Sequence, residues 1–205
     1  MLAFDHLAIG AETLGAGTEA VEAALGVPLE PGGAHPAMGT HNRLLSLGPG
    51  EYLEVIAVDP DAARPNHPRW FALDDFRGAP RPCAWIARTR ALMPALARAP
   101  RGAGQPHALS RGNFAWDMAI PDTGLLPFDG VFPALIAWKS KAHPSDALPD
   151  RGIRLRRLIL SHPDAAALRA ALTPLIEEAR LATTLGAEPH LAAEFDTPTG
   201  ARVLA

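Results

Sequence analysis

The chain has 205 residues, of which 18 are glycine and 21 are proline, and 48% of it is hydrophobic. So many helix-interrupting residues exclude long helical bundles and coiled coils, while the apolar content is too high for a disordered chain. Nineteen basic against 22 acidic residues give a formal net charge of −3, so no basic surface of the kind that binds nucleic acid is expected.

The sequence carries no sign of secretion or of membrane insertion. Cys83 is the single cysteine, so an intramolecular disulfide is not possible. Asp5 and His6 stand where a secretory signal needs an apolar core, and no run of 18 apolar residues is present. We therefore expect a cytoplasmic protein without a membrane partner.

The first 60 residues contain a strand and a helix followed by further strands. Gly26 is a suitable helix end, and the Pro49–Gly50 pair between two apolar runs indicates a β-hairpin. The expected elements are a strand at 3–10, a helix at 12–26, a loop at 29–40 with room for a strand inside 28–36, and hairpin strands at 41–48 and 51–59.

The same order recurs twice along the chain. The second copy has a strand at 82–89, a helix at 91–99 and strands at 107–113, 114–120 and 132–139. The third has a strand at 153–162, a helix at 165–179 capped by Asp164, and short strands up to the C-terminus. The strands that follow each helix are joined by connections too short for parallel crossovers, so they form hairpins. This arrangement indicates the α+β class.

These repeats predict one domain over residues 1–205. Its expected parts are module one at 3–59, a connector at 60–80, module two at 81–141 and a third unit at 152–205.

The most specific pattern lies in residues 32–60. It reads GG-x-HP-x-MGTHNRLL-x-LG and is followed by YLE-x-IA-x-DP, after an opening strand DHLAIG. The pattern resembles the glyoxalase-like branch of the vicinal oxygen chelate superfamily. The resemblance implies βαβββ modules whose mixed sheets curl around a central cavity, which often holds a divalent metal. It says little about the reaction, because one fold hosts many functions.

The resemblance also implies where metal ligands would lie. In the superfamily they come from the first and last strands of each module, which are the positions of His6 and Glu54 in module one. An imidazole and a carboxylate suit Zn, Fe, Ni or Mn. Strand alternation places His6 on the face of Phe4 and Ala8, and Glu54 on the face of Tyr52.

The rest of the chain does not repeat this ligand pair. The first strand of module two offers Cys83 or Ala84, and its last strand has Ala137 where the resemblance leads us to expect an acid. The third unit offers Arg157 and Glu194, and Glu194 would be a ligand only if units one and three shared the cavity. Two ligands make half a site.

Histidines and aromatic residues supply further candidates. His41 at a strand entry is either an acid–base group, beside Glu54, or an ordinary turn residue. Strand aromatics usually belong to a core, but some line ligand slots. Trp70 and Phe71 in the connector suit a lid or a dimer contact. The predicted pocket-lining residues are Tyr52, Trp116, Trp138 and His35.

Two functions of different classes remain open. One is a metal-dependent lyase, isomerase or dioxygenase acting on a small oxygenated metabolite, with His6 and Glu54 on the metal and Glu54 or His41 moving a proton. The other is a metal-free small-molecule binding or sequestration protein of the bleomycin-resistance type, using the same cavity. A structural role with a filled cavity is a third alternative. The expected partners are a small-molecule ligand and, by the resemblance, a second copy in a homodimer.

Overall fold

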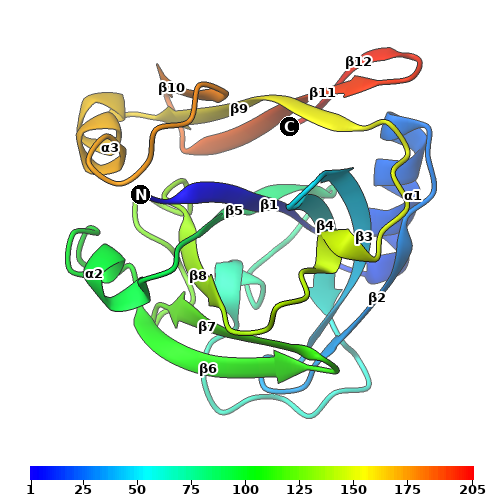
Figure 1. Cartoon of the computed structure of the whole chain (residues 1–205), viewed down its shortest axis with the longest axis horizontal. Coiled ribbons are helices and arrows are strands. Elements are labelled where there is room, and N and C mark those ends of the chain that lie inside the picture. The colour runs from blue at the N-terminus through cyan, green and yellow to red at the C-terminus, as the bar shows by residue number, and fades with distance from the viewer.

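The computed structural model describes residues 1–205 and repeats the order β-α-β-β-β three times (Figure 1). The first unit comprises β1 (Ala3–Gly10), α1 (Leu14–Leu25), β2 (Glu30–His35), β3 (Thr40–Gly48) and β4 (Glu51–Val58). The second comprises β5 (Arg81–Arg88), α2 (Leu92–Leu96), β6 (Gln105–Arg111), β7 (Phe114–Ile120) and β8 (Ala134–Trp138). The third comprises β9 (Arg154–His162), α3 (Ala165–Leu172), β10 (Leu181–Leu185), β11 (His190–Thr197) and β12 (Gly200–Leu204). The predicted α+β class is confirmed.

Units one and two share one eight-stranded mixed sheet. Its strand order is β2-β3-β4-β1-β5-β8-β7-β6. The units meet where β1 pairs antiparallel with β5, with Leu7 opposite Trp85. In each unit the first strand runs parallel to the last, and hairpins supply the other pairs. The sheet curls into an open barrel (Figure 1), so strands of both units surround its concave side.

The third unit forms its own four-stranded sheet, which covers the convex side of the barrel. Its strand order is β10-β9-β11-β12. Leu158 and Phe195 from this sheet share one buried core with Leu7 of β1 and with Val21 and Leu25 of α1. In Figure 1, β9 and β11 lie above β1, whereas the concave side opens away from them. The third unit therefore supports the barrel from outside.

A second buried cluster fills the concave side. It contains Ala8 and Ile56 from unit one and Ala84 and Ile136 from unit two, all at most 2% exposed. Trp70 of the connector packs into the same cluster. The alternation of each strand thus divides its apolar residues between two cores, and any polar residue on the concave face must find a partner there.

The helix ends follow from local residues. Thr13 caps α1 by accepting from the backbone N–H of Ala16, and Gly26 ends it at a φ of 73°. Asp164 caps α3, as predicted, through the N–H of Ala167. That helix ends at Leu172 instead of continuing to 179, because Pro174 lacks an N–H to extend it. None of the helices is both long and apolar enough to cross a membrane.

Candidate functional site

A β-bulge in β1 orients the two polar residues of this strand. The pairing of β1 with β5 shifts between Phe4 and His6, so Asp5 is an inserted residue. Phe4 then packs in the outer core, while His6 and Ala8 face the concave side. The expectation that Phe4 shares a face with His6 is wrong, because strict alternation does not persist through a bulge.

Asp5 is a fully buried carboxylate surrounded by donors. Its Oδ1 lies 2.6 Å from Nδ1 of His6, and its Oδ2 accepts from Nε1 of Trp138 at 3.0 Å. The same Oδ2 lies 3.3 Å from Nε2 of His143 and 3.6 Å from Nη1 of Arg88. Burial alone would raise the pKa of Asp5, but the hydrogen bonds from His143 and His6 outweigh it and hold the pKa well below its usual value. Asp5 is therefore an anion at neutral pH.

His6 lies between two carboxylates. Its Nε2 is 3.6 Å from Oε1 of Glu54 and 3.4 Å from Oη of Tyr52, whose ring stacks on the imidazole at 4.2 Å. Burial alone would lower the pKa of His6, but hydrogen bonds to Asp5 and Glu54 outweigh it and raise the pKa to about 8. At pH 7 the ring is therefore an imidazolium.

Glu54 completes a chain of charged groups that begins at Asp5. Its Oε2 accepts a hydrogen bond from Nδ2 of Asn42 at 2.7 Å. Burial would raise the pKa of Glu54, but the hydrogen bond and positive charge of His6 outweigh burial and lower it. Glu54 is thus ionised, although its side chain is only 6% exposed.

Arg111, at the end of β6, joins the two edges of the curled sheet. Its Nη1 lies 2.9 Å from Nε2 of His35 on β2 and 3.0 Å from Oδ1 of Asn42. Burial is the main reason why the pKa of His35 falls to about 4, so this ring is neutral and accepts from Arg111. Arg111 is not recognisable as a site residue from the sequence, because no pattern around it distinguishes it from other arginines that precede turns.

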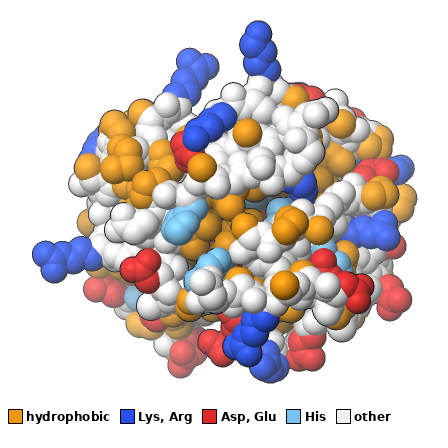
Figure 2. Space-filling view, turned by 90° about the horizontal axis from the view of Figure 1, so that it is seen from below, with side chains coloured by type: hydrophobic (Ala, Val, Ile, Leu, Met, Phe, Trp, Pro, Cys, Tyr) orange, Lys and Arg blue, Asp and Glu red, His pale blue; other side chains and the backbone are white.

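These groups enclose a narrow cavity with aromatic walls. Its lining residues are His6, His35, Asn42, Tyr52, Glu54, Trp70, Phe71, Arg111, Trp116, Met118, Ile136 and Trp138. All four residues predicted to line a pocket are among them. The free space is about 30 Å³, room for roughly two water molecules. Seen from below, the molecule is hollowed near its middle, with hydrophobic atoms inside the hollow and histidine side chains at its edge (Figure 2).

His41 does not lie in this cavity. Its neighbour Asn42 points to Glu54, so alternation along β3 turns His41 to the other face. There its Nδ1 lies 4.0 Å from Oδ1 of Asp59, and its side chain is 27% exposed. The predicted catalytic pair of Glu54 and His41 is therefore not brought together by the fold.

Comparison with known proteins places the chain in a family. Residues 4–176 match the family model described as glyoxalase-like domain. The chain belongs to the glyoxalase-like domain family. This confirms the resemblance to the vicinal oxygen chelate superfamily that was predicted from residues 32–60.

One solved structure shares the fold of this glyoxalase-like protein, and two others match it with lower TM-scores. A hypothetical protein from Staphylococcus aureus has a TM-score of 0.58 at 12% identity, covering 95% of this chain and 81% of its own. Methylmalonyl-CoA epimerase from Mycobacterium tuberculosis has a TM-score of 0.44 at 18% identity, covering 72% and 97%. The methylmalonyl-CoA epimerase from Streptomyces coelicolor has a TM-score of 0.45 at 15% identity, covering 69% of this chain and 100% of its own. No curated protein matches the chain.

Superfamily members often bind divalent metals, but the donors of this glyoxalase-like protein do not complete a metal site. His6 and Glu54 face each other, yet no three His, Cys, Asp or Glu side chains come together anywhere in a way that suits a metal ion. Unit two contributes Ala84 and Ile136 to the concave face, while Ala137 packs against the outer core.

The third unit adds no ligand either. Glu194 pairs with Arg157 within the four-stranded sheet, on the convex side of the barrel. Units one and three therefore do not share a cavity, and Glu194 does not reach the central one.

Addition of Zn²⁺, Ni²⁺, Mn²⁺ or Fe²⁺ to chelator-treated protein is expected to leave its melting temperature unchanged. A ligand raises this temperature only when it binds the folded state, and a single imidazole–carboxylate pair is half of a metal site. Thermal unfolding with each metal, with metal content measured after dialysis, tests this. A saturable rise that disappears in His6→Ala would contradict it.

Proposed function

We propose that this glyoxalase-like protein binds a small oxygenated metabolite in its central cavity and moves a proton on it without a metal ion. The observation that carries the proposal is the buried Asp5–His6–Glu54 chain, which sets an imidazolium between two carboxylates on the cavity wall. Buried ion pairs often stabilise a protein no better than well-packed hydrophobic residues of the same volume, so stability alone does not explain this group. Residues with perturbed pKa values also cluster at functional sites. The reaction class is that of an isomerase or a lyase.

Each of the three residues Asp5, His6 and Glu54 has a part in such a reaction. Glu54 is the base that takes a proton from a carbon next to a carbonyl group. His6 donates from Nε2 to the oxygen on which negative charge develops, and a pKa of about 8 suits a donor at neutral pH. Asp5 is a positioning residue that keeps the ring protonated and correctly oriented, and Tyr52 fixes the ring plane by stacking.

The cavity also favours a class of substrate. Arg111 adds a fixed positive charge, and the buried indole N–H of Trp70 has no acceptor. Both suit carbonyl or carboxylate oxygens. Because the free volume is small, a larger substrate needs a lining segment to move, and we propose the Trp70–Phe71 segment of the connector for this role. The backbone there is strained, since Phe71 has a φ of 58°.

Hydrogen exchange with D₂O tests the proposal. A panel of small 2-oxo acids, 2-hydroxy ketones and 1,3-dicarbonyl acids is incubated with the protein, and loss of the C–H signal is followed by ¹H NMR. Wild-type protein is expected to accelerate exchange for at least one class, and Glu54→Gln is expected to return it to the buffer rate. Asp117→Asn, which removes half of the exposed pair with Lys139, should keep the wild-type rate. Absence of exchange in compounds that bind would refute proton transfer.

A second candidate function is metal-free binding or sequestration. It is favoured by the aromatic walls, in which the rings of Trp116 and Trp138 lie 5.5 Å apart, and by the apolar concave face of unit two. It predicts that a ligand raises the melting temperature equally in wild type and Glu54→Gln, without exchange. The homodimer expected from the resemblance belongs to this proposal as well and is checked by the molar mass in solution.

A further inference from the structure

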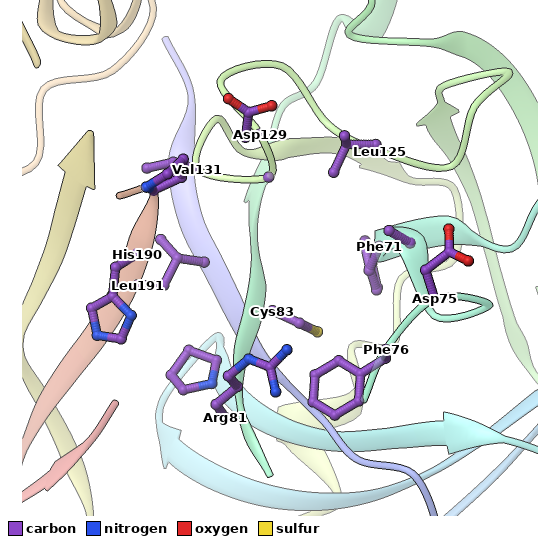
Figure 3. Close-up of a pocket in the computed structure, with 14 residues that line it drawn as sticks. Phe71, Asp75, Phe76, Arg81, Cys83, Leu125, Asp129, Val131, His190 and Leu191 are labelled. Carbon is purple, nitrogen blue, oxygen red and sulfur yellow. The ribbon is translucent and has the colours of Figure 1, made fainter. Parts of the chain in front are cut away.

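A second pocket lies outside the central cavity, where the start of β5, the connector and β11 meet (Figure 3). Its volume is about 270 Å³, close to the lower end of the range for small-molecule sites. Its apolar lining comes from Phe71, Phe76, Cys83, Leu125, Val131 and Leu191. The pocket therefore has room for a small organic molecule and an apolar surface to receive it.

Arg81 is the charged group that points into this pocket. Its guanidinium carbon lies 4.2 Å from the ring centroid of Phe76. Nη1 donates to the backbone carbonyls of Arg77 at 2.8 Å and Ala79 at 3.2 Å. These contacts fix the guanidinium in one place and leave Nε and Nη2 free to donate to a ligand.

The carboxylates of the pocket do not neutralise this charge. Asp75 and Asp129 also line it, but in Figure 3 their carboxylates lie across the pocket from the Arg81 guanidinium. Asp129 lies instead 3.6 Å from Nε2 of His162. An immobilised cation without a carboxylate partner, beside an apolar floor, matches a ligand with one carboxylate and a compact apolar body.

We infer that this pocket is a second binding site, for a small organic carboxylate with an aromatic or branched apolar body. The carboxylate pairs with Arg81, and the apolar body packs on Phe71, Val131 and Leu191. The inference does not depend on the proton transfer proposed for the central cavity, since no residue of the Asp5–His6–Glu54 chain lines this pocket.

One residue belongs to both sites. Phe71 lines the second pocket and the central cavity, and its ring stacks on Trp70 at 5.5 Å. Phe71 and Ala72 have φ angles of 58° and 51°, a region that non-glycine residues rarely adopt. A ligand that packs against Phe71 in the second pocket restrains the segment bounding the central cavity, and such coupling acts in both directions.

The probe for the test is 4-fluorobenzoate, titrated against the full chain and followed by ¹⁹F NMR. Wild-type protein is expected to bind it, and Arg81→Gln is expected to weaken binding by about ten-fold or more, because charge-assisted hydrogen bonds are lost. Arg101→Gln, the same change at an exposed arginine elsewhere, should bind as wild type. The neutral 4-fluorobenzyl alcohol should bind more weakly and show no loss in Arg81→Gln.

Two further variants locate the probe. Leu125 is 42% exposed at the pocket wall, so Leu125→Trp should fill the pocket without disturbing the core and abolish binding. Arg111 lines the central cavity and not this pocket, so Arg111→Gln should leave probe binding at the wild-type level. The inference would be overturned if the probe lost binding to Arg111→Gln but not to Arg81→Gln. It would also be overturned if the wild-type protein bound no probe at millimolar concentration. The fluorescence of Trp70 is obtained as the difference between wild type and Trp70→Phe. If it does not change when the probe binds, the proposed coupling between the two sites is wrong.

Discussion

Replacement of Asp5 by alanine is expected to lower the free energy of unfolding by about 3–5 kcal/mol, the usual cost of removing one partner of a buried ion pair. Asp5 is 0% exposed and accepts from His6 and Trp138, with His143 and Arg88 close by. Without it, the buried imidazolium of His6 and the half-buried indole N–H of Trp138 lose their partner. Such a loss is a large part of the stability of an ordinary domain. Urea unfolding followed by circular dichroism measures it.

Asp117→Ala is the matched control for this experiment. Asp117 pairs with Lys139 at 2.6 Å, but the two side chains are 29% and 52% exposed. Exposed ion pairs contribute about 0–1 kcal/mol, so this variant should stay close to wild type. Equal, small effects of the two substitutions would show that Asp5 does not hold the site together.

The stability of the protein is expected to fall by about 1.3 kcal/mol as the pH rises from 6.5 to 8, out of about 2 kcal/mol lost over the whole titration. The cause is His6, whose pKa is raised from 6.5 to about 8 in the folded state by Asp5 and Glu54. A group whose pKa is higher in the folded than in the unfolded state stabilises the folded state fully at pH values below its unfolded-state pKa. This contribution is lost as the pH rises through its folded-state pKa. Unfolding free energies at half-unit pH steps measure the slope, and His6→Gln should remove it.

The opposite slope is expected on the acidic side. Burial is the main cause that lowers the pKa of His35 to about 4, so the folded state keeps this ring neutral while the unfolded chain binds a proton below pH 6.5. Asp5 and Glu54, with their lowered pKa values, act in the same direction. Stability should therefore be greatest near pH 6.5. A stability that keeps rising up to pH 9 would contradict the assignment of His6.

Much of the fold could be predicted from local sequence. Gly26, Asp164 and the Pro49–Gly50 turn marked element boundaries that the structure shares, because caps and tight turns depend on a few adjacent residues. The length of α3 was overestimated, because the apolar periodicity continues into Leu175 and Ile176. These two residues are buried in the outer core after the helix has ended.

The site was predictable only in part. His6 and Glu54 were recognisable because the family pattern surrounds them, and alternation correctly placed Tyr52 beside Glu54. Asp5 is not recognisable from the sequence as a site residue, because strict alternation would put neighbouring strand residues on opposite faces. The bulge that turns both residues inward depends on the pairing of β1 with β5, and β5 begins 71 residues after β1 ends.

The α+β class, the repeated order of elements and the family could all be predicted from the sequence, since periodicity, turns and motifs are local properties of the chain. Tertiary structure alone decided which polar groups meet. Arg111 reaches His35 across the two edges of the curled sheet, and His143 reaches Asp5 from a loop after β8. Such contacts follow from sheet closure, because barrel curvature brings together side chains that no sequence spacing relates.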